Sequence, residues 1–161
     1  MFNADNRGAR MMQSLQVKPY SLESSEGKKF ETPTADIVVK AGTQQTGGSF
    51  NLFEVKAMAG FATSLHIHYA EDVALFVLDG SLTVYWGDEK KAAEPGDYFF
   101  QPRGLPQGFR VTGDAPARLL YLAVPAGLDG LIDQVLSAAC DVECMAIAAR
   151  YQVEILGPLP G

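Results

Sequence analysis

The sequence predicts an all-β fold, a sandwich or barrel of antiparallel strands, followed by two helices. Short apolar or alternating runs follow one another closely from residue 35 to residue 124, and Gly, Pro and Asp separate them. Asp79-Gly80 and Gly87-Asp88 are typical of tight turns, because these residues tolerate the positive φ that such turns need. Strands joined in this way are antiparallel. With 161 residues, 47% of them hydrophobic, the chain can bury one core.

Three segments are expected along a single domain that spans residues 1–161. Residues 1–34 are polar and mixed in charge, which favours an arm; residues 35–125 carry the barrel, and residues 126–161 a helical segment. The charged run 88–91 is interpreted as a solvated turn. Strands are expected at residues 36–40, 50–58, 64–68, 73–78, 82–86, 98–101, 108–111 and 118–124.

Two helices are expected after Pro125. Asp141 is placed to cap the second, which would carry Met145, Ile147 and Ala148. Apolar residues recur with a helical period in the first, and they must cover either the outside of the barrel or a second subunit. They are Leu128, Leu131, Ile132, Val135 and Leu136.

The composition argues against several classes of partner. Thirteen basic and nineteen acidic residues leave a net charge of −6, so nucleic acid and anionic membranes are poor partners. No apolar run approaches the length of about 20 residues that spans a bilayer, and the first residues lack the apolar centre of a signal peptide. A cytoplasmic protein is expected. Cys140 and Cys144 lie four residues apart in a predicted helix, and both are expected to be buried thiols.

The chemistry centres on the only two histidines of the chain, His66 and His68. Side chains two residues apart on a strand project to the same face, so the two imidazoles are expected side by side. Two imidazoles on the same face can bind one metal ion or one substrate molecule together. The spacing alone is a weak signal, because two histidines can fall on a half-exposed strand by chance.

The surroundings of this pair resemble the two signatures of the cupin superfamily. Gly60, His66, His68 and Gly80 resemble G-x5-H-x-H-x3-4-E-x6-G, and residues 96–107 resemble G-x5-P-x-G-x2-H. The chain is similar to small bacterial cupins of the quercetin dioxygenase type. This resemblance implies a double-stranded β-helix, or jelly-roll barrel, whose mouth holds three histidines and a glutamate around Fe, Mn, Ni, Cu or Zn. It also implies a homodimer, in which the N-terminal arm could add a strand to the neighbouring subunit.

Two of the four implied ligand positions differ in this chain. His66 and His68 match, but Val73 stands at the glutamate position and Gln107 at the third histidine position. An amide oxygen is a weak ligand for the metals that imidazole favours, and two imidazoles alone hold a divalent metal loosely. No tightly bound metal is therefore expected, with Fe, Ni, Mn or Zn weakly held by His66, His68 and Asp72 as the alternative.

Three carboxylates remain candidates to complete a metal site. Asp72 fits the shorter spacing from the histidine pair but stands one residue too far from Gly80, so it points to the other face unless a bulge returns it. Glu71 would have to swing inward from the connecting loop. Glu54 lies on a strand that passes the pocket in such barrels.

The leading hypothesis is an enzyme that uses His66 and His68 as acid and base and Gln107 to orient the substrate. Histidine titrates near neutrality, and two adjacent imidazoles disfavour sharing two positive charges. Isomerisation, cyclisation or dehydration of a small, largely apolar molecule, aromatic or polyketide- or terpenoid-like, suits such a pocket. Its expected lining is Glu54, Val73, Leu75, Phe99, Phe109 and Tyr121.

Two other functions remain open from the sequence. A metal-dependent dioxygenase would use His66, His68 and one of the three carboxylates as a facial triad. A non-catalytic binding protein would hold a metabolite in the same barrel without converting it.

Overall fold

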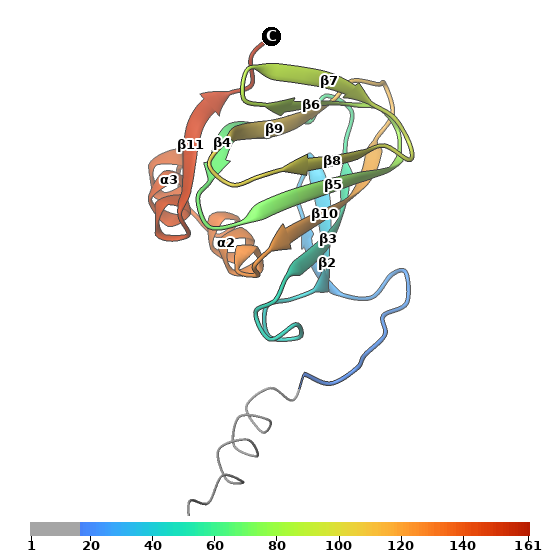
Figure 1. Cartoon of the computed structure of the whole chain (residues 1–161), viewed down its shortest axis with the longest axis vertical. Helices are drawn as coiled ribbons and strands as arrows, with labels where there is room; N and C mark the ends of the chain where they lie inside the picture. Colours follow the sequence, from blue (N-terminus) through green and yellow to red (C-terminus); the bar gives the residue numbers. More distant parts are fainter. Residues whose placement is uncertain (1–16) are drawn as a thin grey trace, which may run out of the picture.

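The computed structural model describes residues 17–161, which form two antiparallel sheets (Figure 1). The six-stranded sheet has the order β1-β2-β3-β10-β5-β8, and the five-stranded sheet has the order β11-β4-β9-β6-β7. The first comprises β1 (Lys28–Glu31), β2 (Ala35–Ala41), β3 (Asn51–Ala57), β10 (Ala117–Val124), β5 (Asp72–Asp79) and β8 (Tyr98–Gln101). The second comprises β11 (Val153–Pro158), β4 (Ser64–His68), β9 (Pro106–Val111), β6 (Leu82–Trp86) and β7 (Glu89–Ala93). The predicted all-β, jelly-roll fold class is confirmed.

Alternate side chains of the strands fill the space between the two sheets. In β3, Phe53 and Val55 are buried, whereas Glu54 between them points to the opposite face. In β5, Val73 and Leu75 are completely buried. This alternation therefore decides which side chains of each strand can reach the interior of the barrel.

Three strands were not expected from the sequence. β7 covers most of the charged run interpreted as a turn, and it pairs with β6 as an edge strand, where exposed lysines are common. β1 lies within the expected arm and pairs with β2 of its own chain. The described part of the arm thus adds a strand to its own sheet, while residues 1–16 lie outside the described range. β11 pairs with β4, so the segment 126–161 is not purely helical.

Helices α2 (Leu128–Val135) and α3 (Asp141–Arg150) lie on one side of the barrel, next to β11 (Figure 1). The Asn51 side chain, completely buried, accepts hydrogen bonds from the backbone N–H groups of Gly127 and Leu128 at 2.8 and 2.9 Å. These bonds satisfy donors at the start of α2 and tie the helix to β3.

Two expectations for α3 were wrong. Asp141 does not cap the helix: it is the first helical residue, and the cap position belongs to Cys140, whose backbone is extended. The thiols are not buried, since Cys140 is exposed and Cys144 partly so. The helix packs through Ile147 and Ala148, which leaves its N-terminal end near solvent.

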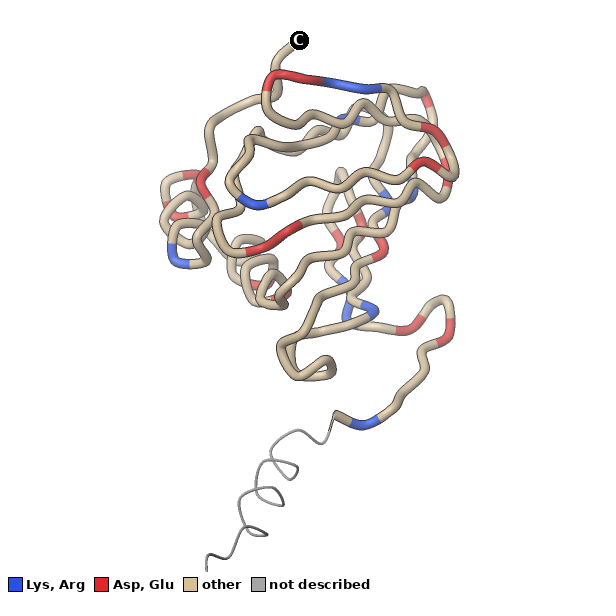
Figure 2. The backbone as a smooth tube through the Cα atoms, viewed as in Figure 1, with Lys and Arg blue, Asp and Glu red and all other residues tan. Residues whose placement is uncertain are grey.

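Charged residues of both signs are spread over the molecule (Figure 2). Several form ion pairs on the outer faces of the strands. Within residues 17–161, neither helix has the length and apolar character that crossing a membrane requires.

Candidate functional site

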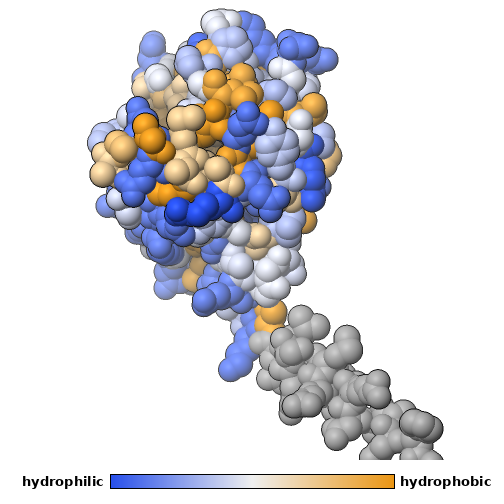
Figure 3. Space-filling model, turned by 90° about the vertical axis from the view of Figure 1, so that its left-hand side faces the viewer, coloured by the Kyte–Doolittle hydropathy of each residue, from blue (hydrophilic) through white to orange (hydrophobic). Residues whose placement is uncertain are grey.

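A cavity of about 340 Å³ lies between the barrel and α2. Strands β2, β3, β4, β9, β10 and β11 contribute to its wall, and α2 together with the residue that follows it supplies five apolar residues. These are Leu128, Leu131, Ile132, Val135 and Leu136, the set whose period predicted the helix. Their apolar face lines the cavity. Figure 3 shows the side of the molecule on which the helices lie, and hydrophobic residues gather there between polar ones.

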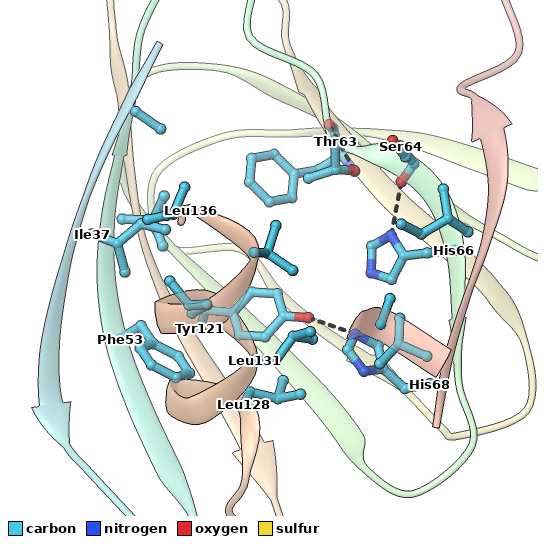
Figure 4. A pocket seen from close by; sticks show the side chains of 18 of the residues that line it. Ile37, Phe53, Thr63, Ser64, His66, His68, Tyr121, Leu128, Leu131 and Leu136 are labelled. Atoms are coloured by element: carbon cyan, nitrogen blue, oxygen red, sulfur yellow. Dashed lines mark hydrogen bonds between the residues drawn. The ribbon is translucent and has the colours of Figure 1, made fainter. Parts of the chain in front are cut away.

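The two histidines stand side by side in this cavity, as their spacing on β4 predicts (Figure 4). Their ring centroids are 4.9 Å apart, and the ring planes are nearly perpendicular, at 81°. His68 is buried, with 3% of its surface exposed, whereas His66 is only partly buried. The two imidazoles therefore share one apolar space but differ in their surroundings.

His66 has the features of a neutral base. Its Nδ1 lies 2.7 Å from the backbone carbonyl oxygen of Ser64, so Nδ1 carries the proton and donates it. The Nε2 lone pair is then free toward the cavity. Burial in apolar surroundings and the neighbouring charge on His68 lower the pKa of His66 to about 4, although the Ser64 carbonyl opposes the shift. His66 is therefore ready to accept a proton at neutral pH.

His68 lies between a carboxylate and a phenol. Its Nδ1 is 3.3 Å from Glu71 Oε2, and its Nε2 is 3.2 Å from the hydroxyl oxygen of Tyr121. Glu71 is as buried as His68, with 4% exposed. Burial, reinforced by the negative charge of Glu71, raises the pKa of Tyr121, so its hydroxyl stays protonated at neutral pH.

This arrangement was not predicted from the sequence. Glu71 was expected as a possible metal ligand, whereas its carboxylate contacts the nitrogen of His68 that points away from Tyr121. The signal available was the position of Glu71, three residues after His68 at the end of a strand. Tyr121 was expected in the pocket and does line it.

The other two carboxylates do not reach the histidines. Asp72 accepts two hydrogen bonds from the guanidinium of Arg103, at 3.0 and 3.1 Å, and one from its backbone N–H. Glu54 pairs with Arg118 at 2.7 Å. Asp72 lies on the outer face, as its spacing from Gly80 predicts, and does not join the histidines as the alternative metal site required. The expectation for Glu54 was wrong, because it does not line the cavity. The alternation of β3 and β5 turns both outward, because Val55 and Val73 point inward.

Gln107 lies beside His66 but is closed off from the cavity. The two residues are direct partners in the register of β4 and β9. Gln107 has 1% of its surface exposed, and neither atom of its amide has a hydrogen-bond partner in the described part of the chain. Such an amide is costly to bury, so it marks a strained or functional position.

The remaining expected pocket residues divide between the core and the cavity. Phe109 lines the cavity. Val73, Leu75 and Phe99 are buried in the core and do not line it. The sequence could place these residues on inward faces, but it could not show which level of the barrel each one reaches.

The residues present do not fit a tightly held metal. Within residues 17–161, no three His, Cys, Asp or Glu side chains are placed so that they could hold one ion. The Nε2 atom of His68 faces the Tyr121 hydroxyl. Beside the two histidines, the remaining two ligand positions that the resemblance implies are occupied by Val73 and by the enclosed Gln107.

Comparisons with known proteins agree with the fold. Residues 53–124 match the family model of the cupin domain. A stretch of 93 residues is 31% identical to quercetin 2,3-dioxygenase of Bacillus subtilis, covering 58% of this chain but only 28% of that protein. The fold, the histidine pair and these matches together support a cupin-superfamily protein.

Solved structures with the same fold come from proteins of several activities. KdgF from Halomonas sp. aligns with a TM-score of 0.62 at 21% identity, over 70% of this chain and 99% of its own. The polyketide cyclase RemF from Streptomyces resistomycificus aligns with a TM-score of 0.58 at 22% identity, over 66% and 80%. The nucleoside dehydratase Pac13 aligns with a TM-score of 0.57 at 16% identity, over 70% and 88%. Identities at this level show the fold alone.

Proposed function

We propose that this protein is an enzyme that converts a small, largely apolar metabolite by acid/base chemistry without a tightly bound metal. Isomerisation, cyclisation or dehydration of an aromatic, polyketide- or terpenoid-like compound is the class of reaction. The observation that carries this proposal is His66, a neutral imidazole with its Nε2 free toward an apolar cavity.

The cavity supplies what a proton transfer needs. A general base must be unprotonated at the working pH, and His66 meets this condition down to about pH 4. Its partner His68 is paired with a buried carboxylate and stands 4.9 Å away, centroid to centroid. Apolar walls exclude water and strengthen interactions between charges inside the cavity.

The same fold is found in proteins described by this class of reaction, which is compatible with the proposal. One is described as a polyketide cyclase and another as a nucleoside dehydratase. The apolar wall of α2 favours a hydrophobic substrate for the present chain.

Proton exchange in heavy water tests the proposal without knowledge of the natural substrate. The probe is 2-tetralone, a bicyclic ketone with acidic C–H bonds next to its carbonyl, and NMR follows the replacement of these hydrogens by deuterium. The wild-type protein, dialysed against a chelator, should accelerate the exchange. His66→Asn keeps a donor for Ser64 but has no base, and it should lose the acceleration. Equal rates for both proteins would reject the proposal.

A second candidate is a metal-dependent dioxygenase, which the similarity to quercetin 2,3-dioxygenase favours. It would require His66, His68 and Glu71 to rearrange around an ion, with Glu71 leaving its present contact. Oxygen uptake with quercetin, dependent on added Fe²⁺, Mn²⁺ or Ni²⁺ and absent in Glu71→Gln, would support it. Tight binding of a ligand without turnover would instead favour a non-catalytic binding protein.

The assembly expected from the resemblance stays a prediction. A homodimer should give twice the chain mass of 17.3 kDa in light scattering. A monomer mass at the concentrations used for the exchange assay would reject it.

A further inference from the structure

The cavity has a polar side and an apolar side. Its polar side chains come from β4, from the residue before β4 and from one position of β10, whereas the walls formed by β2, β3, α2 and β11 are apolar. In Figure 4 the two imidazoles project from one side of the open space, and Ile37, Phe53 and Leu136 lie on the other side. A molecule that fills this cavity therefore needs one polar end and an apolar body.

Most hydrogen-bonding atoms on the polar side already have partners within the chain. His68 contacts Glu71 through Nδ1 and the Tyr121 hydroxyl through Nε2. The Nδ1 atom of His66 meets the backbone carbonyl of Ser64. Of the four imidazole nitrogens, Nε2 of His66 is thus the one without a partner within residues 17–161, so a polar group of the ligand is expected beside it.

The other two polar side chains add no second binding point inside the cavity. The Thr63 hydroxyl accepts a hydrogen bond from the backbone N–H of Phe109 at 3.1 Å, and Ser64 is exposed to solvent. A hydroxyl group suits the single point beside His66, because a hydroxyl both donates and accepts. It therefore pairs with Nε2 whether or not that nitrogen carries a proton.

Helix α2 gives the apolar side a closed end and an open end. The exposed fraction of its cavity-lining residues rises from 4% for Leu128 to 45% for Leu136, the residue that follows the helix. The beginning of α2 is fixed, because the Asn51 side chain binds the N–H groups of Gly127 and Leu128. The cavity is therefore closed at the N-terminal end of α2 and nearest to solvent at its C-terminal end.

The volume limits the length of the apolar body. If each non-hydrogen atom takes about 30 Å³, as a water molecule does in the liquid, the cavity of about 340 Å³ holds about 11 such atoms. Leu131 lies in the middle of the lining face, one turn after Leu128 and one turn before Val135. The size of its side chain thus decides how much of this space is open.

We propose that the substrate is an amphiphile with a hydroxyl at His66 and an apolar body of about ten carbon atoms along α2, and that Leu131 is the residue that determines specificity for the length of this body. The proposal rests on the proposed function, which assigns catalysis to this cavity, and it names the substrate class. The far end of the body lies beside Leu136, so longer bodies extend into solvent there without further gain in affinity.

A series of 1-alkanols tests the length by isothermal titration calorimetry with the wild-type protein. Each buried methylene should tighten binding about fourfold. Affinity should therefore rise from 1-hexanol through 1-octanol to 1-decanol and stop rising at 1-dodecanol, whose last carbon atoms reach solvent. Absence of 1-decanol binding, a flat series, or a rise that continues with the same factor to 1-dodecanol would overturn the proposal.

Two variants of Leu131 test its role in specificity. The side chain of phenylalanine has three more non-hydrogen atoms than leucine, so Leu131→Phe should stop the rise near 1-heptanol and weaken 1-decanol binding about 50-fold. Leu131→Ala should extend the rise to 1-dodecanol. Leu156→Phe makes the matched change at an exposed leucine of β11 outside the cavity lining and should keep the wild-type series. Wild-type series in both Leu131 variants would refute this role.

The position of the hydroxyl has its own tests. A second hydroxyl on the apolar body would lie against α2 without a partner, so 1,6-hexanediol should bind about tenfold more weakly than 1-hexanol. With ¹⁵N-labelled histidine, 1-decanol should shift the Nε2 signal of His66 and leave the signals of His68 nearly unchanged. Equal affinities of the diol and the alcohol, or an unshifted His66 signal, would contradict the assigned orientation.

The outcomes separate this proposal from the proposed function. If the wild type does not accelerate 2-tetralone exchange but the alkanol series rises and stops as described, the proposed function fails and the amphiphile remains the ligand class of the cavity. If exchange is fast and the alkanol series is flat, the proposed function stands and the ligand class is wrong. Competitive inhibition of the exchange by 1-decanol would support both.

Discussion

The low pKa of His66 should make the stability of the fold depend on pH in a defined window. An unfolded chain protonates His66 near its ordinary pKa of 6.5, but the folded chain does so only at about pH 4. Between these values the unfolded state binds a proton that the folded state does not, so the free energy of unfolding falls as the pH falls. The penalty is absent above about pH 7 and is complete near pH 4.

The difference between the two pKa values sets the magnitude. At about 1.4 kcal/mol per pH unit, the full shift corresponds to about 3 kcal/mol. His66 is partly exposed, and solvent screening reduces this figure, so a loss of about 2 kcal/mol between pH 7 and pH 4 is expected.

Urea unfolding of wild type and His66→Asn at pH 4, 5, 6 and 7 measures this effect. The asparagine does not titrate but can still donate to the Ser64 carbonyl, so the variant should lack this part of the pH dependence. The ring ¹⁵N signals give the pKa of His66 directly. A His66 that titrates near 6.5, or two unfolding curves with the same pH dependence, would refute the assignment of His66 as a neutral base.

Three further predictions follow from the site. Gln107→Met removes two buried amide atoms that find no hydrogen-bond partner within residues 17–161 and keeps the volume, so urea unfolding should show a gain of about 1 kcal/mol. Leu131→Trp should fill part of the cavity beside α2 and abolish the 2-tetralone exchange, while circular dichroism shows an intact fold. Asp72→Asn should change neither zinc uptake, measured by elemental analysis, nor the exchange rate, because this carboxylate is paired with Arg103 outside the cavity. Zinc bound by the wild type and lost in this variant would contradict the structure.

Much of the site could be predicted from local pattern. The spacing of His66 and His68 on a strand requires a common face, whatever the rest of the fold. The period of the apolar residues in α2 likewise predicts a helix with one apolar face. Neither pattern indicates what the apolar face of α2 packs against, so only the tertiary structure shows that α2 forms a wall of the cavity.

The sequence could not predict which of three carboxylates lies beside His68. Glu54, Glu71 and Asp72 were all candidates from the sequence, which specified none of them, although the spacing of Asp72 predicted the outer face. Strand register turns Glu54 and Asp72 outward to arginines, and only the residue in the connecting segment remains beside His68. A shift of one residue along a strand reverses such an outcome.

By itself, the sequence determined the alternation of the strands, their turns and the pairing of two imidazoles on one face, since these depend on neighbours a few residues apart. The tertiary structure decided which carboxylate meets His68, that Tyr121 meets its other nitrogen, and that Gln107 is enclosed beside His66. These contacts join distant strands, so they depend on register and packing across the whole barrel, which no local pattern encodes.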